Sequence, residues 1–276
     1  FEPRTQNAEP GTQNPKTEHP LHIIVCIKSV VIEAPRGKIV RTADKCALNP
    51  FDRPALEVAL QLKEKHGGSV TVLSMGPPTA ETTLREALAA GADRAVLLCD
   101  PVLAGSDTLA TSTALCAGVH SLAPFDLLLF GTRTSDSDTG QVGPQTAVLL
   151  DLPTVTGAVK IDGDLDCLAV ERKVDGFLEI YEVSLPAALT IHPTAAAQRD
   201  PALGDLAVAF DEMPVETVSI RQVGIDPSLV GEAGSPTRVL SMKPIQKNRA
   251  CRWIEGPPAA QADALVRELV DAGLIG

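Results

Sequence analysis

The feature that most constrains the fold is a short apolar run that leads directly into a polar loop and then into a helix. Residues 126–130 read Asp-Leu-Leu-Leu-Phe, and the run stops at Gly131. Thr, Ser, Asp and Gly dominate the next positions, and a helical pattern covers 141–150. A short apolar run bounded by turn residues predicts a buried strand. Open α/β sheets bind ligands at such loops, between the carboxyl end of a strand and a helix start.

This polar loop (residues 131–141) carries side chains that suit a phosphate or a sugar. Backbone N–H groups at the following helix start can hold a phosphate. Asp136 and Asp138 cannot face a phosphate directly, and they suit ribose hydroxyls, flavin N–H groups or the backbone of the loop. A solvated turn rich in Asp and Ser explains the same composition, and composition alone leaves both interpretations open. The hydroxyl groups that can donate to the ligand are those of Thr132, Thr134, Ser135 and Thr139.

Strands and helices alternate over the first part of the chain. The predicted strands cover 21–30, 69–74, 94–98 and 126–130, and the predicted helices cover 49–65, 79–90, 106–122 and 141–150. We expect Asp52 to cap the first helix, Ser106 or Asp107 to cap the third, and Gly91 to end the second. This alternation predicts an α/β fold with a doubly wound, mostly parallel, Rossmann-like sheet.

The pattern changes after Asp151. Short extended runs at 153–161, 168–173, 178–185 and 187–192 predict antiparallel strands added to the sheet, and 36–40 predicts a short hairpin arm. From Pro193 the chain loses periodicity, which predicts an extended C-terminal arm with one late helix at 262–272. An arm without its own core usually lies on a partner. The predicted organisation is a disordered tail (1–20), a nucleotide-binding or FAD-binding α/β domain (21–192) and an arm (193–276).

Charge and cysteine usage exclude several classes of function. The net charge of −11 argues against nucleic acid or an anionic membrane as the main partner. No apolar run approaches the roughly 20 residues that span a bilayer, so we expect no direct membrane insertion. The 6 cysteines form no Cys-x-x-Cys pair, and the 5 histidines are scattered. We therefore expect no metal site, and a reduced, cytoplasmic protein.

The motifs of common catalytic and phosphate-binding loops are missing from the sequence. It contains no Gly-x-Gly-x-x-Gly fingerprint, no Walker loop and no Gly-x-Ser-x-Gly elbow. No histidine is paired with a nucleophile in a recognisable pattern. The sequence therefore predicts a nucleotide site without a reaction centre of its own, in which a bound redox cofactor supplies the chemistry. Whether the chain counts as an enzyme stays open at this point.

Several segments, in order and in register from 21 to about 190, carry a resemblance to a known family. They are Val-Cys-Ile-Lys at 25–28, Asn-Pro-Phe-Asp-Arg-Pro-Ala-Leu-Glu at 49–57, Met-Gly-Pro-Pro at 75–78, 83–93, the polar loop, 174–179 and 185–190. Together they resemble the β subunit of electron transfer flavoprotein. The resemblance implies a fold like that of the adenine nucleotide α-hydrolases and a heterodimer with an electron transfer flavoprotein α subunit. It also implies exchange of electrons with a flavin-dependent dehydrogenase or another redox enzyme.

The resemblance also implies which residues contact the cofactor, which is FAD or, alternatively, AMP. These residues lie at the carboxyl ends of predicted strands and at predicted helix starts, where open α/β sheets bind ligands. They are Cys26, Asn49, Pro50, Phe51, Asp52, Met75, Gly131, Thr132, Arg133, Thr134, Ser135, Asp136, Ser137, Asp138, Thr139, Gly140, Gln141 and Val142.

Three stretches resemble the electron-bifurcating subtype, which holds FAD in this site and takes hydride from NADH. They are Asp-Ser-Asp-Thr-Gly-Gln-Val-Gly-Pro at 136–144, 104–112 and Gly-Ser-Pro-Thr-Arg at 234–238. In that subtype Asp107, Thr108 and Thr111, at the start of the third helix, would serve the flavin. The other subtype holds AMP here and carries its flavin on the α subunit, and it is the alternative.

The chain departs from the family pattern at two places. The family's Lys-Gln after the first glycine of the loop is Thr132-Arg133 here, and apolar family positions are Thr134 and Ser135. The segment that usually recognises a partner is Ala-Ala-Ala-Gln-Arg-Asp at 195–200 and lacks the family's Leu and Asn-Glu-Pro. A subunit that has lost its flavin, or a non-redox adenine-nucleotide-binding module, therefore stays open as an alternative.

Overall fold

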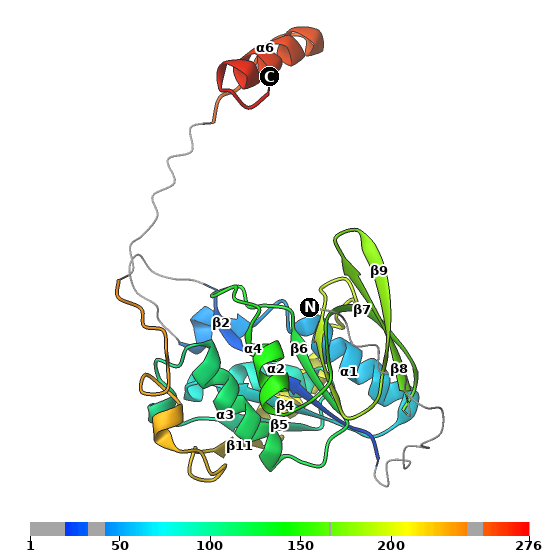
Figure 1. Ribbon diagram of the computed structural model, residues 1–276, viewed down its shortest axis with the longest axis vertical. Coiled ribbons are helices and arrows are strands. Elements are labelled where there is room, and N and C mark those ends of the chain that lie inside the picture. Colours follow the sequence, from blue (N-terminus) through cyan, green and yellow to red (C-terminus); the bar gives the residue numbers. More distant parts are fainter. Residues whose placement is uncertain (1–19, 33–41, 166, 242–250, 276) are drawn as a thin grey trace, which may run out of the picture. The chain divides into compact units, whose positions relative to one another are not determined.

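The computed structural model describes residues 20–32, 42–165, 167–241 and 251–275. The chain divides into two compact units, 1–240 and 241–276. The hairpin arm expected at 36–40, and the tail expected at 1–20 apart from Pro20, lie outside the described residues. The larger unit is built around one sheet, with helices on both of its faces (Figure 1).

Within the described residues this sheet has nine strands in the order β11-β5-β4-β1-β6-β10-β7-β8-β9. Every neighbouring pair from β11 to β7 is parallel, and only β7–β8 and β8–β9 are antiparallel. The predicted doubly wound, mostly parallel sheet is therefore confirmed. The strands are β1 (His22–Cys26), β4 (Ser69–Met75), β5 (Arg94–Leu98), β6 (Leu127–Gly131), β7 (Thr154–Asp164), β8 (Cys167–Val174), β9 (Phe177–Val183), β10 (Ala187–Ile191) and β11 (Val215–Val218).

The prediction that all four late strands are antiparallel additions is wrong for β7, which continues the parallel sheet and is antiparallel only to β8, and for β10. This strand lies between β6 and β7 and runs parallel to both. All five of its residues are buried, because helices cover both of its faces. An unbroken apolar sequence is typical of a parallel strand inside a sheet, whereas an added antiparallel strand alternates.

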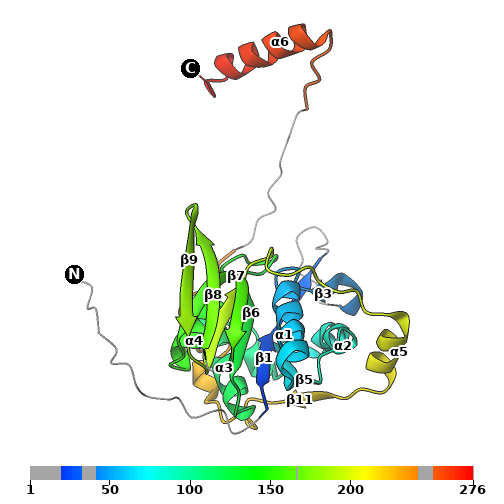
Figure 2. The ribbon, with the colours of Figure 1, turned by 90° about the vertical axis from the view of Figure 1, so that its right-hand side faces the viewer.

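Two helix layers enclose the sheet (Figure 2). The larger apolar cluster packs α1, α2 and α5 on one face, and the second cluster packs α3 and α4 on the other. The helices are α1 (Arg53–His66), α2 (Glu81–Ala89), α3 (Thr108–Ser121), α4 (Val142–Leu149), α5 (Leu203–Asp211) and α6 (Pro258–Asp271). Short 3-10 turns lie at Ala43–Lys45, Pro78–Ala80, Pro101–Leu103 and Pro227–Leu229, and a separate antiparallel pair is formed by β2 (Ser29–Val31) and β3 (Cys46–Leu48).

The direction in which the chain winds reverses at β1. The path from β1 through β4 to β5 builds one side of the sheet, and β6 and β10 build the other. Cys26, at the end of β1, is level with Phe130 near the end of β6. The connections that leave β1 and β6 therefore turn in opposite directions, which opens the crevice where doubly wound sheets bind ligands.

The C-terminal arm is more ordered than the sequence predicted. Besides the late helix, confirmed as α6, residues 203–218 form α5 and the edge strand β11, which pairs with β5. Both elements are short, and their order depends on contacts with distant parts of the chain. The guanidinium of Arg85 on α2 donates to the carbonyl oxygens of Ala209, Phe210 and Met213 at 2.7, 3.0 and 3.1 Å, so it closes the C-terminal end of α5.

The unit 241–276 contributes α6 to the described residues. Its apolar side chains Leu265, Val266 and Val270 are each about half exposed, at 50–51%. None of the described helices has both the length and the apolar content of a bilayer-spanning segment.

We predict that Arg85→Ala loosens the arm more than the rest of the protein. The substitution leaves carbonyl oxygens at the end of α5 without their charged donor, at a cost of about 1–3 kcal/mol. Hydrogen exchange should therefore accelerate over 203–218. Arg94→Ala is the matched control, because its pair with Glu216 on β11 is about half exposed and contributes at most about 1 kcal/mol. Equal acceleration in both variants would contradict the role given to Arg85.

Candidate functional site

The crevice is built first by the connection between β1 and α1. After β1 the chain forms β2 and returns along β3, and the N–H of Asn49 donates to the carbonyl of Lys28 at 3.0 Å. The segment 49–52, called the entry segment below, therefore lies at the carboxyl end of β1. Its side chains meet the polar loop that follows β6.

Asn49 fixes the first turn of the polar loop. Its side chain is fully buried, its Nδ2 donates to the carbonyl of Arg133 at 2.9 Å, and its Oδ1 accepts from the N–H of Ser135 at 3.2 Å. Both ends of the amide are thus bonded to the loop backbone. A buried amide with both ends paired defines one loop conformation, because any other would leave polar groups without partners.

Asp52 occupies the position before α1, as predicted, but its side chain does not cap the helix. Its backbone is already helical, with φ −86° and ψ −20°, whereas a capping residue is usually extended. The carboxylate instead accepts from the N–H of Lys28 at 2.7 Å and from the N–H of Gly131. Burial raises the pKa of this carboxyl to about 7, although the bonds from Lys28, Asn49 and Gly131 act to lower it.

The two carboxylates of the loop are neutralised by neighbouring cations. Nζ of Lys28 lies 2.8 Å from Oδ1 of Asp136, and a guanidinium nitrogen of Arg133 lies 3.3 Å from Oδ1 of Asp138. The Arg133 guanidinium also lies 4.5 Å from the centre of the Phe51 ring. The acidic side chains that could not face a phosphate are therefore paired within the site, and the loop does not repel an anion by its own charge.

The end of the polar loop presents backbone donors at the start of α4. Asp138 and Gly140 have left-handed φ values of 53° and 63°, and a Cβ on Gly140 would lie 3.1 Å from the carbonyl of Thr132. Among the described residues, the N–H groups of Thr139 and Gly140 donate no hydrogen bond. Free N–H groups before a helix N-terminus are the usual partners of a phosphate, so these residues fit the phosphate end of a nucleotide cofactor.

The start of α3 is linked to the same site. Oγ1 of Thr108 donates to Oε1 of Gln141 at 3.1 Å, which joins the starts of α3 and α4. Asp107 caps α3 as predicted, accepting from the N–H of Ala110 at 3.0 Å. Its second oxygen accepts from the N–H and hydroxyl of Thr237 at 3.0 and 2.8 Å, and its own N–H donates to Ser235.

The structure therefore brings together most of the residues that the sequence singled out. The entry segment and the polar loop are in direct contact, and Thr108 joins them through Gln141. The side chain of Cys26 belongs to the apolar cluster under α3 and α4, and the partly buried side chain of Met75 packs against that cluster. Burial also raises the pKa of the Cys26 thiol.

Sequence reasoning missed Lys28, Ser235 and Thr237 as parts of the site. Lys28 stands at the end of a predicted strand, where a surface position explained it equally well. Ser235 and Thr237 belong to the stretch 234–238 that carries part of the resemblance, and nothing in the sequence places them at Asp107. No group of potential metal ligands occurs among the residues that the structure describes.

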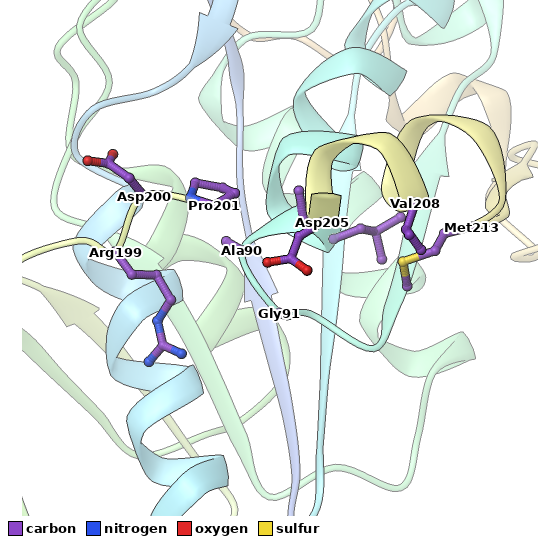
Figure 3. A pocket seen from close by; sticks show the side chains of 10 residues that line it. Ala90, Gly91, Arg199, Asp200, Pro201, Asp205, Val208 and Met213 are labelled. Atoms are coloured by element: carbon purple, nitrogen blue, oxygen red, sulfur yellow. The ribbon is translucent and has the colours of Figure 1, made fainter. Parts of the chain in front are cut away.

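A separate pocket of about 370 Å³ lies beyond this site (Figure 3). It is formed by the C-terminal end of α2, the segment 199–201 and α5, so it lies where β5 begins rather than where the strands end. Its lining combines apolar side chains with Arg199, Asp200 and Asp205.

We predict that Gly131→Ala destabilises the protein and disturbs the loop. A Cβ at this position would collide with Oδ1 of Asp52 and with the carbonyl of Phe51, and both are held by the surrounding structure. The cost should be about 1–3 kcal/mol, measured by urea unfolding. Gly204→Ala is the matched control, because a Cβ there meets nothing within 4 Å and alanine favours the helix α5. A Gly131→Ala variant as stable as this control would contradict the close approach.

Comparison with known proteins identifies the family of this chain. The family model described as the electron transfer flavoprotein domain matches residues 36–223. The chain is 37% identical over 255 residues to the electron transfer flavoprotein subunit beta of Thermoanaerobacterium thermosaccharolyticum, covering 90% of this chain and 98% of the relative. It is 39% identical to the protein FixA of Azorhizobium caulinodans, covering 90% and 94%. It is 38% identical to the caffeyl-CoA reductase-Etf complex subunit CarD of Acetobacterium woodii, covering 79% and 86%. The chain therefore belongs to the electron transfer flavoprotein family, among its β subunits.

Proposed function

We propose that this β subunit binds FAD at the polar loop and passes electrons within a heterodimer with an α subunit. The donor is NADH, in an electron-bifurcating reaction, or a flavin-dependent dehydrogenase. The observation that carries the proposal is a loop at the reversal point of the sheet, whose carboxylates are paired with Lys28 and Arg133. If the complex bifurcates electrons, this chain is its NADH-oxidising flavoprotein component.

Each part of the site has a distinct task in this proposal. The free N–H groups of Thr139 and Gly140, with those of the first turn of α4, bind the phosphates. The remaining contacts come from Cys26, Met75, residues 49–51 and the other residues of 131–142. FAD supplies the electron-accepting and electron-donating ring, for which the protein provides only binding and orientation.

The start of α3 supports FAD over AMP. FAD is longer than AMP, and it needs polar groups beyond the phosphates. Thr108 reaches the polar loop through Gln141, and Thr111 lies one helical turn further along α3. The N-terminal end of a helix carries a partial positive charge, which would stabilise a reduced, anionic flavin. Asp107 already bonds to Ala110 and Thr237, so its part in the proposal is to hold this helix start.

AMP binding by a non-bifurcating β subunit is the second candidate. It is favoured by the tight bonding of Asp107 to the arm, since both carboxylate oxygens accept bonds from the protein itself. In that case the adenosine phosphate would occupy the polar loop, and the subunit would act structurally while the flavin sits on the α subunit.

Partner contacts follow from the same proposal. Two of the relatives are named as subunits, and one of these two as a subunit of a reductase complex. The segment 195–200 is held on α1 by Arg199, which bonds to Glu57 at 2.9 Å and to Glu64 at 2.6 Å. We propose that this segment faces the redox partner, that the arm packs on the α subunit, and that the complex works in the cytoplasm.

We predict one FAD in this chain for each heterodimer, in addition to the flavin of the α subunit. The purified complex would be denatured, and its released FAD and AMP counted by chromatography. Two FAD and no AMP support the bifurcating proposal. One FAD and one AMP would leave a simple electron carrier.

We also predict that the double variant Thr139→Ala with Gln141→Ala weakens nucleotide binding while the protein stays folded. Each substitution removes one side chain that is proposed to donate a hydrogen bond at or beside the phosphates. The combined loss of binding free energy should be about 1–3 kcal/mol. The matched control is Ser121→Ala with Gln61→Ala, whose bonds to Gly118 and Glu57 lie outside the site. Unchanged nucleotide retention in the loop variant would remove the polar loop from the site.

A further inference from the structure

We propose that Asp52 is a positioning residue, whose buried carboxylate holds the polar loop in its binding shape without itself contacting the cofactor. This inference rests on the proposed function, in which the loop retains a nucleotide. It gives Asp52 a different task from Thr139 and Gly140, whose free N–H groups face the ligand.

The geometry places Asp52 beneath the loop. The residue is 5% exposed, and its carboxylate receives the N–H of Lys28 at the end of β1 and the N–H of Gly131 at the end of β6. The carboxylate is packed so closely that a Cβ on Gly131 would collide with its Oδ1. One side chain thus bonds to the ends of both β1 and β6, where the connections that follow these strands diverge.

Asn49 extends this tie into the loop. It stands three residues before Asp52 in the entry segment and bonds to the backbone of Arg133 and Ser135. The N–H of Asp52 in turn donates to the carbonyl of Asn49 at 2.9 Å. A shift of Asp52 would therefore move the entry segment and the first turn of the loop together.

The groups around the carboxylate are suited to its ionised form. The backbone groups that reach it are N–H donors, and an ionised carboxylate accepts with both oxygens. In a protonated carboxyl one oxygen becomes a hydrogen-bond donor, and it would face the N–H donors of Lys28 and Gly131. Asparagine has the same shape, and its amide NH₂ also places a donor where the ionised carboxylate has an acceptor. The Asp52→Asn variant therefore mimics the protonated state at every pH.

The charge of Asp52 changes within the physiological range, because burial raises its pKa to about 7. The titratable groups that face it are Lys28 and Cys26, on the β1 side. Burial and the charge of Asp52 raise the pKa of the Cys26 thiol, so that thiol stays neutral near pH 7. The other groups that reach the Asp52 carboxylate are uncharged: Asn49 from the entry segment and Gly131 from β6. Nucleotide affinity should therefore rise as the pH increases through 7.

The test measures nucleotide affinity of the purified heterodimer between pH 5.5 and 8.5, with FAD and AMP as probes. We expect the wild-type affinity to rise roughly tenfold over this range, as one pKa unit of linkage gives. The Asp52→Asn variant should bind as weakly at pH 8 as the wild type does at pH 6, with a flat profile. Glu57→Gln is the matched control, since Glu57 is equally buried on α1 but bonds to Arg199 outside the site.

Stability of the nucleotide-free complex supplies the readout that separates positioning from general support of the fold. Burial raises the pKa of Asp52 in the folded protein because it outweighs the hydrogen bonds that favour the ionised carboxylate, so ionisation of Asp52 lowers the stability of the fold as the pH rises from about 4 towards 7. Relative to the wild type, Asp52→Asn should therefore gain stability between pH 5 and 8 while it loses nucleotide. A merely structural carboxylate would lose both together.

Three results would overturn the inference. They are wild-type affinity in Asp52→Asn, a wild-type pH profile that is flat or falls with pH, and equal loss of nucleotide in Glu57→Gln. A wild-type complex that binds neither FAD nor AMP at any pH would reject the proposed function instead.

Discussion

Parallel pairing of β1 with both β4 and β6 is the constraint on which the rest of the structure depends. Residues Ile23, Ile24 and Val25 are completely buried, so β1 can only occupy the middle of the sheet. With β4 on one side and β6 on the other, the connections that leave β1 and β6 must diverge. That divergence brings the entry segment and the polar loop together, although about eighty residues of sequence lie between them.

Buried polar groups then convert this crevice into a defined site. Asn49 and Asp52 are buried among backbone donors and acceptors of both connections, and buried polar groups of this kind tolerate few alternative arrangements. Above them, Lys28 and Arg133 pair with the acidic residues of the loop. The counter-charges for the two carboxylates thus come from the connection between β1 and β2 and from the loop itself.

The departures from the family pattern also have a structural consequence. The resemblance leads to the expectation of a lysine at 132, and the chain instead has Arg133, whose guanidinium lies over the Phe51 ring and pairs with Asp138 within the same loop. The positive charge therefore stays in the site. In the segment 195–200, Arg199 binds Glu57 and Glu64 on α1, so this stretch is fastened to the domain by an ion-pair network.

The sequence by itself determined the alternation of strands and helices, a cap of the third helix at Ser106 or Asp107, and the polar loop after β6, because each depends on residues close together in the chain. It also identified the family, through segments that keep their order and spacing. Only the tertiary structure decided that β10 enters the sheet between β6 and β7, that α5 and β11 are ordered, and that Asp52 reaches Gly131 rather than its own helix. It likewise placed Lys28 on Asp136 and Thr237 on Asp107. These features depend on contacts between residues far apart in sequence, and a local pattern carries no information about which distant group will satisfy a buried donor or acceptor.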